Sequence, residues 1–355
     1  MRPSSLPTLP TVGSHGAEVK ERYVTTTISA NHAMVITVRR RLLSLFILLA
    51  ALARMFGAGA AEAASQDTSN PLSVERVADG DYVHFGQVAL TTSDNAGDIA
   101  NLGIIVGRDA VAIVDTGGSV LVGRRLLLAV RQITGKPVRY VINTHEHPDH
   151  IFGNAAFAAP GVTFVGHHNL PTELAKRGTY YLHSFRQQLG PSAIDEVKLI
   201  PPTLLVDQTT TLDLGGRTLL LTAWSPPAHT ACDLTVLDQA TGVLYAGDLV
   251  FLQHVPVIDG SLAGWLEMLP RLAQVEAKIV VPGHGRLAAP WPQALDDERR
   301  YFTVLAADAH RLVVAGVPLA RAVPEIGQSE HAHWQLFDDY NPRNATDAFT
   351  EQEWQ

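Results

Sequence analysis

Hydrophobic and polar positions alternate in two different rhythms along the chain. Short apolar runs rich in Val, Ile and Leu and bounded by Gly, Asp or Asn are typical of strands. Two longer runs, 203–225 and 232–248, contain the turn signals Gly215–Gly216 and Thr241–Gly242, so each predicts a pair of strands. Other strands are predicted within 81–90, 101–118, 138–144, 161–168 and 277–285.

Helical periodicity separates these strands. Apolar residues recur every three to four positions over 124–135, 169–190 and 260–275, which predicts an amphipathic helix, a helical insertion and a further helix. From about residue 290 the pattern is helical again. Strands followed by helices, twice in succession, favour an α/β fold of two half-barrels or of two sheets packed between helix layers.

The composition is that of a globular protein without a basic surface. Of 355 residues, 46% are hydrophobic, which is enough to build one large domain or two small ones. The net charge of -8 and the lack of a Lys/Arg stripe in the body of the chain argue against nucleic acid as a partner. A single cysteine, Cys232, rules out an intramolecular disulfide.

Residues 39–64 have the three parts of a secretory signal: a basic start, a short apolar core and an exit rich in small residues. We expect cleavage after Ala63, which leaves no stable membrane span and a periplasmic or secreted protein. The segment 34–63 is then the signal peptide, Met34 is the true start, and residues 1–33 are a non-native extension. An uncleaved membrane anchor is the alternative interpretation.

The stretch NTHEHPDHIFGN, residues 143–154, brings metal-binding side chains together at the end of a predicted strand. Alternate residues at a strand end point the same way, so His145 and His147 can reach one metal while Asp149 and His150 pass beyond it toward a second. Imidazole and carboxylate groups are the ligands of catalytic zinc sites. The spacing therefore predicts a metal centre.

Further side chains of the same types follow later strand-like runs. His229 lies in SPPAHTACDL, Asp248 in LYAGDLV and His284 in VVPGHGR. Glycines beside Asp248 and His284 allow the backbone to turn sharply and aim these side chains inward. We expect the loops to converge on one place, where they supply the remaining histidines and a bridging oxygen ligand.

The order H-x-H-x-D-H, a lone His, G-D and P-G-H-G resembles the metallo-β-lactamase superfamily, as does VAIVDTGG around Asp115. The resemblance implies a four-layer αββα sandwich over 70–290, with a helical extension over 291–355 packed on the same domain. It also implies two Zn²⁺ ions bridged by Asp248, with Asp115 hydrogen-bonded to a ligand from behind. The implied ligands are His145, His147 and His229 for one ion and Asp149, His150 and His284 for the other.

Finer features resemble the quinoprotein relay system zinc metallohydrolases, a SoxH-like group. They are the signal segment, residues 166–190, the stretches VDQTTTLDLGG and DGSLAGWLEML, and residues 334–354. This resemblance implies an exported quinoprotein dehydrogenase as a partner. The aspartate bridge resembles the thioesterase and glyoxalase II branch, whereas Cys232 does not fit the bridging cysteine of lactamases. Glyoxalase II itself is a poor match because its substrate is cytosolic.

Together, the resemblance and the signal segment imply an exported dinuclear zinc hydrolase. We expect a metal-bridging hydroxide to attack the ester, thioester or amide-like carbonyl of a small acyl substrate. Asp149 and His150 are the expected catalytic residues, because Asp149 can both hold the second metal and orient the hydroxide. Iron or manganese would suit the same ligands. The alternatives are a metal-bearing maturation or binding partner of an exported redox enzyme and a β-lactamase-like activity.

The remaining histidines have plainer interpretations. His167 and His168 end a strand, as the ligands do, but the ligand set is complete without them. The others are expected to be surface residues or satisfied core residues. They are His84, His183, His254 and His310.

Several neighbours of the motifs carry weaker expectations. Glu146 alternates away from the two adjacent histidines, so it is expected to be solvated or to lie behind the ligands. Cys232 is expected to be a small buried hydrophobe. Arg286 is the nearest candidate for an anchor of a substrate carboxylate. Three aromatic residues of the insertion are expected to pack rather than to form a substrate wall, although the insertion could cap the cleft: Tyr180, Tyr181 and Phe185.

Export gives the first testable prediction. Mass spectrometry of native material is expected to find a mature chain that begins near Ala64, because signal peptidase cuts after small residues of this kind. Intact protein starting at Met1 and recovered from the cytoplasm would contradict the expected localisation.

Overall fold

The computed structural model describes residues 70–286 and 288–354. The predicted signal peptide and N-terminal extension lie outside the described residues. Among the helices of the described part, none combines the length and the apolar character needed to cross a lipid bilayer.

The first sheet contains seven strands that lie side by side in chain order. Strands β1 to β4 pair antiparallel, and β4 to β7 run parallel. Parallel neighbours need long connections, and helices supply them here. The strands are β1 (Glu75–Ala78), β2 (Asp81–His84), β3 (Leu102–Val106), β4 (Val111–Val114), β5 (Val138–Ile142), β6 (Thr163–His167) and β7 (Leu204–Val206).

The second sheet contains six strands in the order β13-β12-β11-β10-β9-β8. Strands β8 to β11 form an antiparallel meander, β11 and β12 run parallel, and β13 adds an antiparallel edge. The strands are β8 (Thr209–Asp213), β9 (Thr218–Ala223), β10 (Leu234–Asp238), β11 (Val243–Tyr245), β12 (Ile279–Val281) and β13 (Ala289–Pro290).

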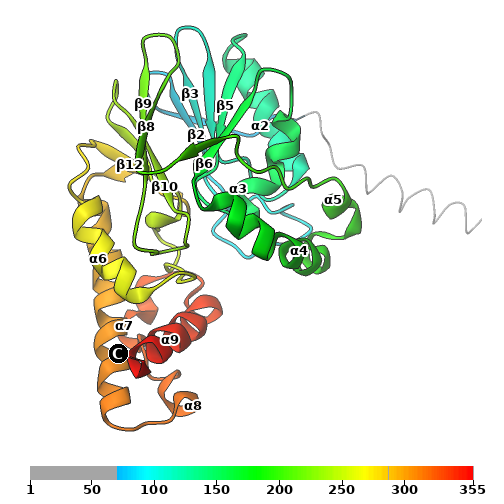
Figure 1. The fold of residues 1–355 in the computed structure, drawn as a ribbon. Coiled ribbons are helices and arrows are strands. Elements are labelled where there is room, and N and C mark those ends of the chain that lie inside the picture. Colours follow the sequence, from blue (N-terminus) through cyan, green and yellow to red (C-terminus); the bar gives the residue numbers. More distant parts are fainter. Residues whose placement is uncertain (1–69, 287, 355) are drawn as a thin grey trace, which may run out of the picture. The chain divides into compact units, whose positions relative to one another are not determined.

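The two sheets face each other across an inner core, and helices cover their outer faces (Figure 1). In β3, Ile105 points into the inner core, while its neighbour Ile104 packs outward with helix α2 (Val120–Ile133). In β9, Leu221 points inward and Leu220 packs against the opposite helix layer. This alternation of side chains produces helix, sheet, sheet and helix layers. The expected αββα sandwich is confirmed.

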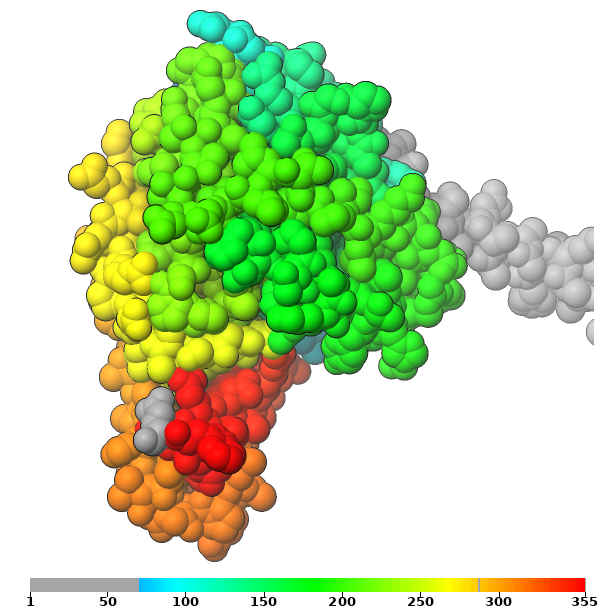
Figure 2. Space-filling model, viewed as in Figure 1, coloured from blue at the N-terminus to red at the C-terminus, as the bar shows by residue number. Residues whose placement is uncertain are grey.

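C-terminal helices cover the outer face of the second sheet. Trp265 of α6 (Leu262–Leu272) is fully buried, and its ring centroid lies 4.6 Å from that of Phe302 in α7 (Asp296–Val314). Figure 2 shows the orange and red C-terminal segments against the yellow segment that contains α6. The remaining helices are α3 (Pro148–Ile151), α4 (Leu170–Leu189), α5 (Pro191–Asp195), α8 (Leu319–Ala322) and α9 (Phe337–Glu353), with the short 3-10 helices η1 (Phe152–Phe157), η2 (Gly247–Leu249), η3 (Gln293–Leu295) and η4 (Gln328–His333).

Two strand predictions were wrong in detail. The range 203–225 holds three strands rather than two, because β7 pairs with β6 in the first sheet before β8 and β9 form a hairpin in the second. The strand expected over 81–90 ends at His84. Beyond it the backbone of Gly86 packs so closely on Ile99 that a Cβ at Gly86 would lie 2.4 Å from the Ile99 carbonyl carbon.

The topology brings the candidate ligands to one edge of the sandwich. Strands β4 and β5 run parallel in the first sheet, and β11 and β12 run parallel in the second. Asp115 follows β4, and the motif 143–150 follows β5. Asp248 lies in η2 directly after β11, and His284 follows β12. Strand β9 runs in the same direction as β11 and leads into His229.

The packing of α2 gives a prediction about stability. Leu126 is fully buried between α2 and the first sheet, so Leu126→Ala is expected to lower the free energy of unfolding by about 2–5 kcal/mol. Urea denaturation would measure the change. Gln132→Ala on the exposed side of the same helix is the control and is expected to stay within about 0.5 kcal/mol of the parent. Equal stabilities of the two variants would contradict this packing.

Candidate metal centre

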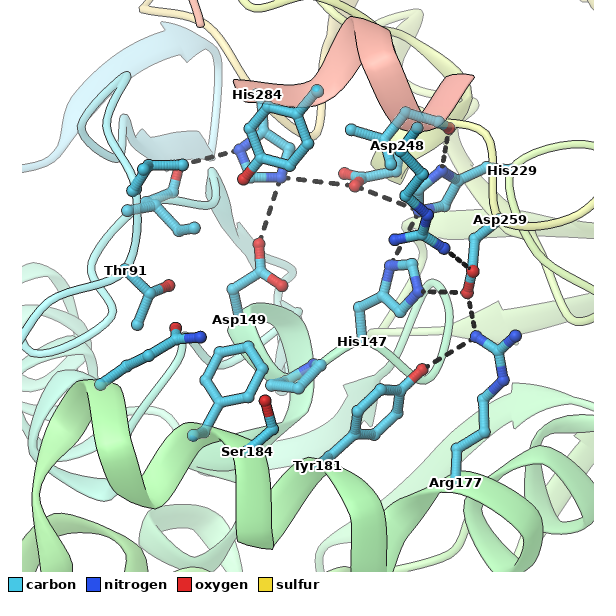
Figure 3. A pocket seen from close by; sticks show the side chains of 18 of the residues that line it. Thr91, His147, Asp149, Arg177, Tyr181, Ser184, His229, Asp248, Asp259 and His284 are labelled. Carbon is cyan, nitrogen blue, oxygen red and sulfur yellow. Dashed lines mark hydrogen bonds and ion pairs between the residues drawn. The ribbon is translucent and has the colours of Figure 1, made fainter. Parts of the chain in front are cut away.

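The candidate ligands form two adjacent groups of donor atoms, and in each group all donor atoms lie within 4.8 Å of one another. Five of these side chains line one cavity (Figure 3), and they are His147, Asp149, His229, Asp248 and His284. The first group is His145, His147, His229 and Asp248, and the second is Asp149, His150 and His284.

Asp248 joins the two groups. Its Oδ2 atom lies 3.3 Å from Nε2 of His229 in the first group and 3.3 Å from Nε2 of His284 in the second. Its Oδ1 atom lies 3.1 Å from Nε2 of His150, and Nε2 of His145 is 3.8 Å from Oδ2. The position expected for a bridging ligand is therefore taken by a carboxylate that faces histidines of both groups.

The turn after β5 separates the ligands of the two groups. His145 and His147 lie on the segment that leaves the strand, and Pro148 then starts the short helix α3. Proline suits the first helical position because it has no N–H to satisfy there. The helical turn carries Asp149 and His150 to the second group. The structure thus places His145 and His147 in one group of donor atoms and Asp149 and His150 in the other.

The donor set fits a cation. Among the described residues, Nε2 of His145, Nε2 of His150 and Oδ1 of Asp248 are buried and have no hydrogen-bond partner. Buried polar atoms without a partner are rare and costly, and a metal ion would supply the missing interaction. Imidazole nitrogens with carboxylate oxygens are ligands that zinc accepts.

Backbone carbonyls and Asp115 orient three histidines from behind. Nδ1 of His229 donates to the Val257 carbonyl at 2.8 Å, and Nδ1 of His284 donates to the Ile99 carbonyl at 3.1 Å. Nδ1 of His150 donates to Oδ2 of Asp115 at 2.8 Å. Each contact fixes a tautomer that leaves Nε2 free toward the ligand groups.

Asp115 is itself held tightly. Its carboxylate accepts hydrogen bonds from the backbone N–H of Thr144 at 2.8 Å and from the Thr144 hydroxyl at 2.7 Å. Its φ of 60° is uncommon for a residue other than glycine. The structure thus places Asp115 behind His150, where it links the end of β4 to the motif that follows β5.

Burial and charge divide the histidines into two kinds. Burial lowers the pKa of His145 well below its usual value and that of His229 to about 4, since desolvation disfavours the imidazolium. Burial acts in the same direction on His284, but the carboxylates of Asp248 and Asp149 outweigh it and raise the pKa to about 9. The pKa of His150 is raised well above its usual value against the same opposing effect. Metal binding must therefore displace protons from the second group.

The family model for the metallo-beta-lactamase superfamily matches residues 96–284. The chain belongs to this superfamily. The match covers the segment from Ala96 to His284 and so contains every residue of the two ligand groups.

Two named relatives align in sequence with part of this chain. A hydroxyacylglutathione hydrolase from Polaromonas sp. (strain JS666 / ATCC BAA-500) is 27% identical over 165 residues, which cover 44% of this chain and 52% of the relative. A linear primary-alkylsulfatase from Pseudomonas sp. (strain ATCC 19151) is 43% identical over 56 residues, 16% of this chain and 11% of the relative. The chain thus spans about half the length of the first relative and a small part of the second.

Solved structures of other proteins show the same fold at low sequence identity. The stereoselective inverting sec-alkylsulfatase Pisa1 from Pseudomonas sp. aligns with a TM-score of 0.61 and 15% identity over 79% of this chain and 50% of that chain. A metallo-beta-lactamase from Pontibacter korlensis aligns with a TM-score of 0.53 and 21% identity over 65% of this chain and 99% of that chain. At these identities the likeness concerns the fold alone.

The structure decides between the two expectations for Glu146. Glu146 is buried rather than solvated, with 1% of its surface exposed, and a carboxylate oxygen lies within 4.8 Å of a ring nitrogen of His147. Its Oε2 atom accepts a hydrogen bond from Sγ of Cys232 at 2.9 Å, and its Oε1 atom lies 3.9 Å from Nη1 of Arg177. Strand β5 ends at Ile142, so strand alternation does not set the environment of residue 146.

A cavity of about 910 Å³ opens onto both ligand groups. Helix α4 contributes Tyr180, Tyr181 and Phe185 to its wall. Tyr181 and Phe185 also pack in a hydrophobic cluster, as expected, but the expectation that Tyr180 packs is wrong, because Tyr180 is 66% exposed. Helix α9 contributes Tyr340 and Arg343. These two walls come from the insertion and from the C-terminal extension, which lie far apart in the sequence. The other lining residues are Leu90, Thr91, Ile99, His147, Pro148, Asp149, Lys176, Arg177, Ser184, Gln188, His229, Asp248, Phe251, His254, Val257, Asp259 and His284.

The remaining candidates lie elsewhere or have other partners. His167 accepts the backbone N–H of Asn169 through Nδ1, and neither His167 nor His168 lines this cavity. Arg286 is exposed and does not line it either. His254 is buried, as expected of a core residue, but it also lines the cavity beside His284, with ring centroids 5.1 Å apart.

The close packing behind Asp248 gives a prediction. A Cβ at Gly283 would lie 1.9 Å from Oδ1 of Asp248, so Gly283→Ala is expected to displace Asp248 and to lower the bound zinc from two ions to one or fewer. Metal analysis after dialysis would measure it. Gly135→Ala is the matched control, because nothing lies within 4 Å of a Cβ there. Two tightly bound zinc ions in both variants would contradict the placement of Asp248.

Proposed function

We propose that this chain is a dinuclear zinc hydrolase that acts on the ester, thioester or amide-like carbonyl of a small acyl substrate. The observation that carries the proposal is Asp248, a buried carboxylate within 3.3 Å of histidines from both ligand groups. A scaffold protein has no need of two such groups beside a cavity. The hydroxyacylglutathione hydrolase relative favours a thioester among these bonds.

The chain's own residues supply the positions that such a reaction needs. His145, His147 and His229 would hold one zinc ion, and Asp149, His150 and His284 would hold the other, with Asp248 between them. The chemistry that such ions supply when bound is a lowering of the pKa of water to about 7 and polarisation of the scissile carbonyl.

Asp149 is the residue best placed to handle a proton. It lines the cavity, and its Oδ2 atom lies 3.2 Å from Nε2 of His284 and 3.5 Å from Nε2 of His150. Burial opposes ionisation of Asp149, but the adjacent imidazoles of His150 and His284 outweigh it and lower its pKa below the usual range. An ionised Asp149 can accept a hydrogen bond from a nucleophilic water and orient it toward the substrate.

The proposal also includes the location of the enzyme and a redox partner. The signal-like segment 39–64 supports a periplasmic or secreted enzyme. The motif resemblance to quinoprotein relay system metallohydrolases supports association with an exported quinoprotein dehydrogenase. A metal-bearing maturation partner with vestigial hydrolysis is the competing function, and a reporter panel separates the two.

The panel consists of thioester, ester, β-lactam and alkyl sulfate reporters tested with the zinc-loaded protein. Turnover of a carbonyl reporter at two zinc ions per chain supports the hydrolase. Two zinc ions without turnover of any reporter would favour the maturation partner. Alkyl sulfate turnover alone would replace the carbonyl substrate with a sulfate ester, the bond named in the alkylsulfatase relative.

Asp248→Asn tests the shared ligand directly. The amide keeps the size of the side chain but loses the charge, and its NH₂ group cannot face a cation. Turnover is expected to fall by at least about 100-fold. Replacing a residue that only hydrogen-bonds a metal ligand typically lowers activity by about 10- to 100-fold, and Asp248 is itself a proposed ligand. The change should appear mainly in kcat, because an interaction of the transition state is lost. Steady-state kinetics and metal analysis would measure both effects.

The control for Asp248→Asn is Asp79→Asn, since the side chain of Asp79 is 90% exposed and lies in the turn between β1 and β2. It is expected to keep parental turnover and zinc content. An Asp248→Asn variant with two zinc ions and parental turnover would show that Asp248 does not bridge the two groups.

A further inference from the structure

Asp259 lies where three parts of the cavity wall meet (Figure 3). It sits on the segment 256–259, here called the brace loop, which precedes α6. Its carboxylate contacts Arg177 of α4 and Arg343 of α9. Oδ2 of Asp259 also lies 3.1 Å from Nε2 of His147. A single carboxylate therefore connects a candidate ligand with both helices of the wall.

The ring of His147 is turned the opposite way to the rings of the other histidine ligands, so its Nε2 atom needs a hydrogen-bond acceptor. Its Nδ1 atom faces the first group, 2.9 Å from Nε2 of His229, so Nε2 points away from that group. Backbone carbonyls or Asp115 hold the rear nitrogens of His229, His284 and His150. For His147 the corresponding acceptor is Asp259. A carboxylate in this place makes the ligand more basic and fixes the tautomer.

The brace loop holds a second ligand of the same group. The backbone N–H of Asp259 donates to the carbonyl of His229 at 3.1 Å, and the carbonyl of Val257 accepts from Nδ1 of His229 at 2.8 Å. Two of the three histidines of the first group therefore depend on four consecutive residues of the chain. The second group makes none of these contacts.

Helix α9 braces the loop from the other side. Oδ1 of Asn344 accepts from the backbone N–H of Ile258 at 3.0 Å, and Nδ2 of Asn344 donates to the carbonyl of Pro256 at 2.6 Å. Asn344 is fully buried. Together with the contact from Arg343 to Asp259, these bonds tie the C-terminal extension to the loop that orients the ligands.

We propose that Asp259 is a positioning residue for His147, and that α4 and α9 set the metal affinity of the first ligand group through Arg177 and Arg343. The inference rests on the proposed dinuclear centre. It adds that the C-terminal helix, far from the ligand motifs in sequence, is part of what makes the site bind metal.

Arg177 argues against a third cation site beside His147 and Asp259. Glu146, His147 and Asp259 also have donor atoms within 4.8 Å of one another, which would suit a third cation. However, Nη1 of Arg177 contacts Asp259 and lies 3.9 Å from Oε1 of Glu146. The guanidinium therefore already supplies positive charge to both carboxylates, and a planar guanidinium suits this bridging better than an ammonium group would.

The experiment measures zinc affinity without any substrate, so a failure of the proposed hydrolysis does not affect it. The purified zinc-loaded chain is titrated with a competing chelator, which resolves a dissociation constant for each ion. Cobalt substitution assigns the constants, because the absorption spectrum of Co²⁺ reports the ligand geometry of each group.

In Asp259→Asn, zinc in the first group is expected to bind about 10- to 100-fold more weakly, the usual effect of losing a carboxylate behind a ligand, while the second group changes by less than about threefold. The proton on Nε2 of His147 is expected to move upfield in NMR spectra, because an amide is a weaker acceptor than a carboxylate. A purely structural role would leave this signal in place.

Asp347→Asn is the matched control. Asp347 lies on α9 with its Oδ2 atom 3.8 Å from Nε of Arg343, and it does not contact His147. It is expected to keep both zinc affinities. Parental affinity in Asp259→Asn, equal weakening of both groups, or the same loss in Asp347→Asn would each overturn the proposal.

Arg343→Gln keeps the test decisive if Asp259→Asn does not fold. The side chain of Arg343 is 52% exposed, so its replacement is tolerated more easily. It is expected to weaken zinc in the first group alone, by several-fold, since the contact between Asp259 and His147 remains. Unchanged affinity of the first group in Arg343→Gln would also overturn the proposal.

Discussion

The buried carboxylate of Asp248, surrounded by imidazoles, is the interaction on which the whole site depends. An unpaired charge at this depth is costly. Beside it, Nε2 of His145 and Nε2 of His150 have no hydrogen-bond partner among the described residues. The carboxylate therefore raises the pKa of His150 and His284 against the effect of burial, while His145 and His229 stay neutral. The arrangement makes chemical sense as a cage for cations, which replace the protons.

Three of the histidine ligands are held from behind by groups outside the two ligand groups. The carbonyls of Ile99 and Val257 hold His284 and His229, and Asp115 holds His150. The strand ends that supply these groups belong to both sheets, so the packing between the sheets sets the distance between the two ligand groups. Gly283 illustrates how tight this packing is, because its Cα lies against Asp248 with no room for a side chain.

The charged residues of the cavity wall also help to hold a ligand in place. Arg177 and Arg343 line the cavity, but both contact Asp259, and Arg177 also lies near Glu146. Their positive charge is therefore largely committed to carboxylates, and they connect the wall to His147 rather than forming a free basic patch. The apolar part of the wall includes aromatic residues of α4 and α9, such as Tyr180 and Tyr340.

The sequence by itself determined the fold class and the seven side chains that the structure brings together. Strand and helix periodicities are local properties, and they predicted an α/β fold of two half-barrels or of two sheets packed between helix layers. The resemblance of the motifs to the metallo-β-lactamase superfamily narrowed this prediction to the αββα sandwich that the structure shows. The motif from His145 to His150 follows a strand whose end can be read from its apolar run. Ligand types and their spacing are also local, so the two groups could be anticipated before the structure was known.

Only the tertiary structure decided what stands behind and around the ligands. Asp259, Arg177 and Arg343 have no motif, and they meet because α4, the brace loop and α9 converge from distant parts of the chain. The sequence left Glu146 either solvated or behind the ligands, since its buried environment is set by Cys232, far along the chain, and not by strand alternation. Long-range packing produces these contacts, and a pattern of neighbouring residues does not record it.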